Sequence, residues 1–405
     1  MKKKAVIALA AVLLLSGCTD IKDRKVSETK ALTSDTAVTT STAEAETTTE
    51  TAPVITETEA PAEKYTRVSL ICAGDNLIHP PIYNQAKART EDGTYDFTYA
   101  YENVAEYIGD ADLAVLNQET ILSDEFEPSN YPSFCTPTAM GDYMIELGFD
   151  AVSISNNHVL DKGEKGLLST LDYWEKSHPE IPVYGAYKNE EDMNSIRTLE
   201  INGIKFAFLG YMEHTNGLYL NSASECELTY LSEEELIEEQ IKKAREISDC
   251  VVVSLHFGVE ITNTVTDFQK DTAKKLSDWG ADIIIGTQPH TIQTMEFIER
   301  EDGGRSFVFY CLGNFISAQD VARSMVGMLG GITVEKNELT GEITLEKPYA
   351  VPIINHYDSG YRNIRLYPFS EYTEELGSAH GCSGTSYGFF RELIEENIPE
   401  EFLAE

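Results

Sequence analysis

Six short apolar stretches of this chain each end in a cluster of polar side chains whose types could do chemistry. The clusters are rich in Asp, Glu, Asn and His, which bind divalent metals and transfer protons. The stretches before them have the continuous apolar pattern of strands buried on both faces, and ligands of layered α/β folds gather where such strands end. In chain order the clusters contain Asp75, Glu119, Asn157, His256, His290 and Asn314. Brought together, they would form a metal site.

The segment 156–163 has the most specific pattern of the six clusters. It places amide oxygens, an imidazole and a carboxylate directly after a predicted buried strand. Asn157 could give a neutral oxygen to a metal, and His158 could ligate the metal or donate a proton to a leaving group. Asp161 could orient that imidazole. The alternative is that these residues only form a turn and cap the next helix.

Two carboxylates and two further imidazoles occupy comparable positions in the other clusters. Asp75 and Glu119 each follow a strand, where a carboxylate is a hard oxygen ligand, although acids also end strands for local reasons. His256 ends the most β-branched stretch, residues 251–255, where ligation competes with the interpretation of a hydrogen-bonded core histidine. His290 follows a turn that contains Gly and Pro, which would aim its ring back at the sheet edge.

The segments between these strands have the periodicity of helices. Apolar residues recur at helical spacing in residues 164–176, 233–247 and 270–279, so we expect three helices that pack on the sheet. Residues 198–201 and 204–209 predict a hairpin, because Asn202-Gly203 between them fits a type I′ turn. The alternation predicts a layered α/β domain over residues 64–352. Residues 353–405 are expected to form a C-terminal extension packed on it.

The first 63 residues do not have the composition of a folded domain. Three lysines precede the apolar residues 5–15, a signal-peptide pattern too short to span a bilayer; an apolar N-terminal helix of a cytoplasmic protein is the alternative. Residues 15–18 resemble a bacterial lipoprotein box, which implies cleavage and lipid on Cys18. Residues 19–63 are rich in Thr and Glu and predict a flexible stalk, with a root-mean-square span of roughly 40 Å. The predicted location is extracytoplasmic, anchored by lipid to the bacterial cell membrane.

The charge of the chain excludes one class of partner. Thirty-one Lys and Arg against 68 Asp and Glu give a net charge of −37, whose field repels nucleic acid. The same field opposes a polyanionic ligand unless cations intervene, which favours divalent metal, although a solubilising surface is an equal alternative. The seven cysteines contain no C-x-x-C pair, so we do not expect a disulfide framework.

The order of the motifs resembles that of the CapA family, the poly-gamma-glutamate capsule synthesis proteins. Gly-Asp, Asn-x-Glu, Asn-Asn-His-x-x-Asp-x-Gly, His-x-Gly-x-Glu, Gly-x-x-Pro-His and Leu-Gly-Asn-Phe follow one another between about Val68 and Ile316. The resemblance implies a four-layer α-β-β-α sandwich like that of calcineurin-type metallophosphoesterases. It also implies one or two divalent ions (Mn, Zn or Fe), with these metal ligands: Asp75, Glu119, Asn157, His256 and His290.

The same resemblance implies that His158 is the general acid, and we pair it with Asp161. We assign contacts with the substrate to Asn76, Asn156, Gln288 and Asn314, although the last also fits a structural turn near the cleft. The family commonly has His where this chain has Gln288. Because Gln is a weaker, neutral donor, one of two metals would be held loosely or be absent.

Three hypotheses of function follow from these features. The first is a lipid-anchored protein for synthesis, export or surface handling of poly-gamma-glutamate, with membrane-embedded synthesis or export proteins as candidate partners and, if the site is catalytic, metal-dependent hydrolysis. The second is a surface metallophosphoesterase or amide hydrolase with another substrate. The third is a noncatalytic member whose cleft binds polymer or a partner. These hypotheses leave open whether the protein is an enzyme.

Overall fold

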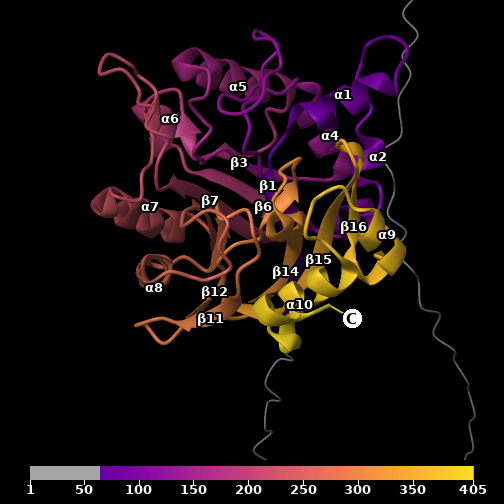
Figure 1. Ribbon diagram of the computed structural model, residues 1–405. Helices are drawn as coiled ribbons and strands as arrows, with labels where there is room; N and C mark the ends of the chain where they lie inside the picture. The colour runs from indigo at the N-terminus through magenta and orange to yellow at the C-terminus, as the bar shows by residue number, and fades with distance from the viewer. Residues whose placement is uncertain (1–63, 405) are drawn as a thin grey trace, which may run out of the picture. The chain divides into compact units, whose positions relative to one another are not determined.

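The computed structural model describes residues 64–404, which include two main β-sheets (Figure 1). The eight-stranded sheet has the order β16-β15-β14-β1-β2-β3-β4, and β13 pairs with the end of β1. Strands β1 to β4 are parallel to one another, whereas β14 to β16 continue the sheet in antiparallel pairs. Its strands are β1 (Tyr65–Asn76), β2 (Leu113–Asn117), β3 (Ala151–Ser153), β4 (Val183–Tyr184), β13 (Asn314–Ile316), β14 (Val326–Asn337), β15 (Ile343–Asp358) and β16 (Arg362–Pro368).

The six-stranded sheet has the order β11-β12-β10-β9-β7-β6. Its central strands are parallel, and β11 and β6 are antiparallel at its two edges. Asn202 and Gly203 join β6 to β7 with φ of 50° and 79°, which agrees with the predicted type I′ hairpin. The strands are β6 (Arg197–Ile201), β7 (Ile204–Met212), β9 (Cys250–His256), β10 (Ile283–Thr287), β11 (Met295–Glu299) and β12 (Arg305–Phe309), and a separate pair contains β5 (Ala186–Tyr187) and β8 (Glu227–Leu228).

The three helices that periodicity predicted are present as α5, α7 and α8. Helix α8 begins with a capping box, in which Thr266 and Gln269 exchange side-chain and backbone hydrogen bonds. The helices are α1 (Pro80–Ala88), α2 (Thr98–Tyr101), α3 (Ala105–Gly109), α4 (Ala139–Leu147), α5 (Gly163–Ser177), α6 (Glu190–Asn194), α7 (Glu234–Ile247), α8 (Asp267–Trp279), α9 (Glu374–Ala379) and α10 (Tyr387–Asn397), with 3-10 turns η1 (Ala322–Met325), η2 (Phe369–Glu371) and η3 (Glu400–Phe402).

Strand β9 explains why the apolar stretches have no polar alternation. Val251 and Val253 pack with α7 and α8, which lie side by side along this sheet (Figure 1). Cys250 and Val252 point to the opposite face and join the core shared with the eight-stranded sheet. Because both faces of the strand are covered, residues 250–253 and 255 are all apolar, and the buried Ser254 shares a hydrogen bond with Tyr184 at 2.9 Å. The expected α/β fold with two packed sheets is therefore confirmed.

The C-terminal residues extend the eight-stranded sheet and then return along it. Strand β15 runs through position 352, where the sequence placed the start of the extension, so residues 353–358 continue a strand of the domain. Ala404 donates a backbone hydrogen bond to Ala350 at 2.9 Å, and α10 contacts β14. In Figure 1 the yellow helices α9 and α10 lie beside these strands.

Three expectations concern residues before position 64. The signal peptide, the lipidated Cys18 and the stalk lie outside the described residues. Within residues 64–404, no helix is long and apolar enough to cross a membrane. The six cysteines of this part of the chain are all buried and free, as the absence of a disulfide pattern predicted.

Candidate metal centre

The polar clusters at the ends of β1, β2, β9 and β10 meet at one place between the two sheets. The ligand atoms of Asp75, Glu119 and His290 all lie within 4.8 Å of one another, and the three side chains are buried. His256 and His158 lie against Glu119, as the distances below show. We call these five residues the strand-end site. Parallel strands of both sheets carry their carboxyl ends to it, as the apolar stretches predicted.

Asp75 is fixed at the end of β1 by two side chains. Its Oδ1 accepts a hydrogen bond from Asn117 Nδ2 at 2.8 Å, and its Oδ2 lies 2.9 Å from His290 Nδ1. Complete burial would raise the pKa of Asp75, but the His290 hydrogen bond and charge outweigh it and lower that pKa. Asp75 is therefore an ionised carboxylate in the protein interior.

Glu119 is the least satisfied polar group of the site. Both carboxylate oxygens are buried, and neither has a hydrogen-bond partner among the described residues. Its Oε1 lies 3.7 Å from His290 Nε2, 3.8 Å from His256 Nε2 and 3.9 Å from His158 Nε2. Burial and the charge of Asp75 raise the pKa of Glu119 well above its ordinary value. A buried carboxylate without donors is costly, and a cation among these three rings would remove that cost.

The hydrogen bonds of His256 define which ring nitrogen carries the proton. Thr287 Oγ1 donates to the carbonyl of Leu255 at 3.0 Å, so it can only accept from His256 Nδ1, 2.9 Å away. Burial lowers the pKa of His256 to about 3, so the ring is neutral and Nε2 holds a lone pair. That lone pair faces Asn157 Oδ1 at 3.1 Å. Nε2 of His256 and Oδ1 of Asn157 are thus two electron-pair donors that face each other, while Thr287 holds the other ring nitrogen of His256. This arrangement is typical of metal ligands.

His290 carries positive charge among the carboxylates. Burial opposes this charge, but Glu119 and Asp75 together raise the pKa of His290 to about 10. Without a metal, the ring thus supplies the positive charge between these carboxylates, and it would release its Nε2 proton on becoming a metal ligand. The buried acids, the neutral His256 and the Asn157 oxygen fit a divalent metal, because they are the N and O donors that such ions take.

His158 stands at the side of the site with its own partner. Its Nδ1 lies 2.8 Å from Asp161 Oδ2, and that oxygen also accepts from the backbone N–H of Phe134 at 2.6 Å. The Phe134 ring packs edge-to-face against the His158 imidazole, with 4.8 Å between the ring centroids. Asp161 and Phe134 therefore fix the orientation of the ring, so that Nε2 faces Glu119. This is the geometry expected of an oriented general acid.

The residues assigned to substrate contacts lie at the site but are largely engaged with the protein. Asn76 donates to Gln118 Oε1 at 2.7 Å and accepts from Tyr101 at 2.9 Å. Asn156 donates to the Gln118 carbonyl at 2.9 Å and accepts from the His158 N–H at 3.1 Å. Asn314, beside Asp75 in the β1–β13 pair, donates to Ser317 Oγ at 3.0 Å. These three asparagines position the clusters, and substrate contact by them stays a prediction.

Sequence reasoning missed three residues that hold the site together. Asn117 and Thr287 support Asp75 and His256, and both stand in the strand ends that the apolar stretches marked. Glu260 accepts a hydrogen bond from Gln288 Nε2 at 3.2 Å. The His-x-Gly-x-Glu motif contained the signal for Glu260, but an exposed acid after a strand usually has only a solvated role. Gln288 is buried beside these groups.

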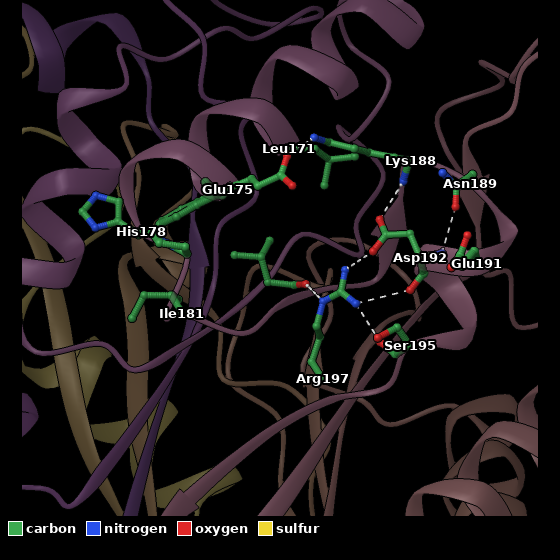
Figure 2. Close-up of a pocket in the computed structure, with 13 residues that line it drawn as sticks. Leu171, Glu175, His178, Ile181, Lys188, Asn189, Glu191, Asp192, Ser195 and Arg197 are labelled. Atoms are coloured by element: carbon green, nitrogen blue, oxygen red, sulfur yellow. Dashed lines mark hydrogen bonds and ion pairs between the residues drawn. The ribbon is translucent and has the colours of Figure 1, made fainter.

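A cavity of about 590 Å³ between α5, α6 and β6 has a different character (Figure 2). We call it the α5–α6 pocket. Lys188 Nζ donates to Asp172 at 2.7 Å and also to Glu175. Arg197 binds the Asp192 side chain and donates to the Ser195 carbonyl at 2.6 Å, as the dashed lines in Figure 2 show. Since carboxylates and carbonyls of the protein already engage these cations, this pocket holds no comparable donor set.

Comparison with known proteins agrees with the motif order. The family described as bacterial capsule synthesis protein PGA_cap matches residues 69–319, more than half of the chain. The chain belongs to this family. The PGA biosynthesis protein CapA of Bacillus subtilis (strain 168) is 29% identical over 192 residues, covering 47% of this chain and 49% of that protein. The capsule biosynthesis protein CapA of Bacillus anthracis is 27% identical over 239 residues, covering 57% and 56%.

This member of the PGA_cap family thus spans about half the length of the curated relatives that it matches. Among solved structures, a phosphatase from Mycoplasma pneumoniae aligns with a TM-score of 0.44 at 14% identity, covering 72% of this chain and 95% of that one. A putative 5′-nucleotidase from Staphylococcus aureus aligns with a TM-score of 0.42 at 15% identity, covering 75% and 54%. Likenesses this distant carry no argument about activity.

Proposed function

We propose that this chain is a lipid-anchored, extracytoplasmic protein that handles poly-gamma-glutamate during its synthesis, export or retention at the cell surface. We further propose that it acts through a metal-dependent, hydrolase-like site. The family supports the role in capsule synthesis. The observation that carries the site is Glu119, whose two buried oxygens have no donor among the described residues although three imidazoles surround it.

The residues of the site fall into two groups, the proposed metal ligands and one proton donor. Asp75, Glu119 and His290 would hold the cation, and Asn157 and His256 present two more electron pairs. A divalent cation supplies Lewis acidity and makes water a better nucleophile near neutral pH. In hydrolysis the water oxygen would bond to the acyl or phosphoryl centre and lose one proton to solvent, the bond to the leaving group would break, and His158 would give that group a proton and then regain one from solvent. Asp161 holds His158 in place for this transfer.

The first experiment measures metal in the full chain purified without chelator. We expect at least one equivalent of a divalent transition metal per chain, and a higher melting temperature with Mn²⁺ or Zn²⁺ than with chelator, because the metal binds the folded state. A chain that retains no metal and gains no stability from either ion would contradict the hydrolase-like site. Glu225→Gln, which removes an exposed acid placed outside the site, is the control for net charge.

A second experiment tests the chemistry and the substrate. The full chain is incubated with purified poly-gamma-glutamate, and chain length and released amino groups are measured. We expect shortening that needs metal and falls at least about 100-fold in His158→Gln, since general acid catalysis contributes about 10²–10⁴-fold. Unchanged polymer, together with tight metal-independent binding of it, would favour a noncatalytic member. Cleavage of phosphoesters but not of polymer would favour the alternative substrate.

The anchor is tested separately in cells. Cys18→Ser should move the protein from the membrane fraction to the soluble extracytoplasmic fraction, since the lipid attaches to that thiol. Cells that lack the protein should make less polymer or fail to retain it at the surface. Normal synthesis, export and retention in those cells would contradict the role in capsule handling, whatever the result of the metal measurement.

A further inference from the structure

Two buried imidazoles lie where the C-terminal extension meets the eight-stranded sheet. His356 is near the end of β15, and His380 follows α9 directly. Only 3% of His356 and 9% of His380 is exposed, and their ring centroids are 4.9 Å apart in an edge-to-face arrangement. We call these two residues the histidine pair. The rings that pack around the pair are those of Tyr357, Tyr367, Tyr372 and Phe390.

Hydrogen bonds hold His380 in one neutral form. Its Nδ1 accepts the backbone N–H of Cys382 at 3.0 Å, so this nitrogen carries no proton. Its Nε2 lies 3.1 Å from the Asn355 carbonyl, which can only accept, so the ring proton is on Nε2. Both ring nitrogens are therefore in use. A second proton on Nδ1 would point at the Cys382 N–H and break that hydrogen bond.

The groups around the pair offer little to a charged imidazole. The acid nearest to His356 is Asp358, whose Oδ1 lies 3.5 Å from Nε2, but its side chain is 34% exposed and its Oδ2 accepts from Asn363 at 2.7 Å. Burial and the neighbouring His356 lower the pKa of His380 to about 4. Burial also lowers the pKa of His356, although Asp358 opposes this. Besides the tyrosines above, the charged or titratable groups around the pair are Cys382, Asp320, Arg362 and Arg365.

The same contacts attach the residues after α9 to the sheet. Next to the hydrogen bond from His380, Gly381 N–H donates to the Tyr357 carbonyl at 2.6 Å. The Phe390 ring of α10 packs against the His380 ring, with 5.7 Å between the centroids. Residues 380–397, which include α10, thus depend on a neutral His380 for several of their contacts with β15.

Helix α10 also lies beside a loop that leads to the strand-end site. It flanks a cavity of about 390 Å³ whose other walls are Arg323 and residues 262–264. These residues continue the loop after β9 that contains Glu260, the acceptor for Gln288. Movement of α10 would therefore open this side of the loop to solvent.

We propose that the histidine pair is an acid-sensitive switch, which holds residues 380–397 on the sheet while both rings are neutral and releases them when His380 is protonated. The pKa of His380 is lower in the closed state than the ordinary value of 6.5, so opening takes up a proton. The closed state is thus fully favoured above pH 6.5 and weakens as the pH falls towards 4. This inference goes beyond the proposed function, and at the proposed extracytoplasmic location the switch would respond to the pH outside the cell.

The alternative is that acid loosens this segment by protonating carboxylates such as Asp358. His380→Asn separates the two explanations, because the Asn Oδ1 can accept the Cys382 N–H in place of Nδ1 but does not titrate. His178→Asn is the matched control. His178 also contacts an acid, with Nε2 2.8 Å from Asp142, but it caps the end of α5 and not the extension.

The experiment measures hydrogen–deuterium exchange of the full chain at pH 7 and pH 5, corrected for the intrinsic rate of exchange at each pH. In the natural protein and in His178→Asn, we expect residues 380–397 to open at least about tenfold more often at pH 5, because the folded state resists protonation. In His380→Asn the increase should be less than about threefold. Equal protection at both pH values in the natural protein, or an undiminished increase in His380→Asn, would overturn the inference.

A second measurement decides the case in which His380→Asn opens at both pH values. Nuclear magnetic resonance of the natural protein follows the imidazole signals as the pH is lowered, and the signal absent from His380→Asn identifies His380. We expect His380 to titrate with a pKa well below the ordinary 6.5. Titration near 6.5 would overturn the inference. Neither measurement depends on metal or on polymer, so its failure leaves the proposed function standing.

Discussion

The strand-end site and the α5–α6 pocket both bring opposite charges together, but they differ in how those charges are satisfied. In the pocket, Lys188 and Arg197 contact carboxylates and carbonyls of the protein. In the strand-end site, the carboxylates are completely buried, and Glu119 has no donor among the residues the structure describes. The pocket is a cavity of about 590 Å³ in which the buried Trp174 Nε1 lacks a hydrogen-bond partner, but none of the carboxylates that line it is buried without a donor. A buried carboxylate with no donor to either oxygen, and not cavity volume, distinguishes the candidate site.

The physical reason for the difference is desolvation. Charges in the pocket remain partly in water, where an ion pair contributes little and is easily replaced by solvent. Charges at the strand ends have lost their water, so each needs a partner of opposite sign or a metal. The comparison therefore predicts opposite responses to substitution: the site should lose metal, and the pocket should lose only stability.

The largest effect is expected for Glu119→Gln. This change should weaken metal binding by more than the roughly 10–100-fold that loss of an outer partner costs, because Glu119 faces three imidazoles at once. In chelator the variant should unfold at the same or a higher denaturant concentration, since the substitution removes a buried carboxyl group whose oxygens have no donors. Metal content and equilibrium unfolding measure the two effects. If Glu119→Gln keeps its metal, the predicted difference between the strand-end site and the pocket is wrong.

Arg197→Ala should show the opposite pattern in the pocket. The guanidinium donates to the Val183 and Ser195 carbonyls and to Asp192, so its loss should cost about 1–3 kcal/mol of unfolding free energy. Metal content should stay unchanged, because none of these hydrogen bonds of Arg197 involves a residue of the strand-end site. Urea unfolding and metal analysis on one preparation check both parts. Arg197→Lys, which keeps the charge, should recover only part of the loss.

Gln288→His should strengthen the binding of Zn²⁺ at the strand-end site. The new imidazole would replace an amide at a buried position beside Glu260, and imidazole is the better ligand for Zn²⁺. We expect retention of Zn²⁺ to rise by about tenfold, measured as metal left after dialysis against a competing chelator. Unchanged stoichiometry and affinity would count against a Gln288 side chain that faces the metal.

The smallest effect is expected for Asp172→Asn in the pocket. The hydrogen bond from Lys188 lowers the pKa of Asp172 in the folded protein. Its contribution is thus present above the unfolded pKa, about 3.9, and disappears as the pH falls through the lower folded value. Because the pair is exposed, the loss should be under about 1 kcal/mol at pH 7. Unfolding curves of both proteins should converge below about pH 4; a constant difference would point to a cause other than charge.

Much of the fold could be predicted because its signals are local. Periodicity found helices α5, α7 and α8, and Asn202-Gly203 gave the hairpin of β6 and β7. The strand ends were recognised because strands covered on both faces have continuous apolar sequences. The extent of β15 was missed, since a strand that pairs on both sides with distant segments has no local end signal at position 352. Pairing partners of this kind depend on tertiary structure.

The types of residue in the candidate site could be predicted from the sequence, but the full set of residues that meet there could not. His158 and Asp161 are three residues apart, so their pairing could be predicted from spacing. Glu260 was not assigned, because an acid four residues after His256 gives no sign of the bent loop that brings it to Gln288. Left-handed backbone at Ile261, a β-branched residue, cannot be expected from sequence, since only long-range hydrogen bonds hold it.

By itself the sequence determined which side chains stand at the strand ends and to which family their order belongs, because both are properties of residues in linear order. Only the tertiary structure decided which of them meet and which lack partners. Asp75 and His290 are 215 residues apart yet lie 2.9 Å from each other. The neutral state of His256 and the missing donors of Glu119 depend on burial and on partners from several strands. Those long-range conditions, and not residue type, turn a set of polar strand ends into a candidate metal centre.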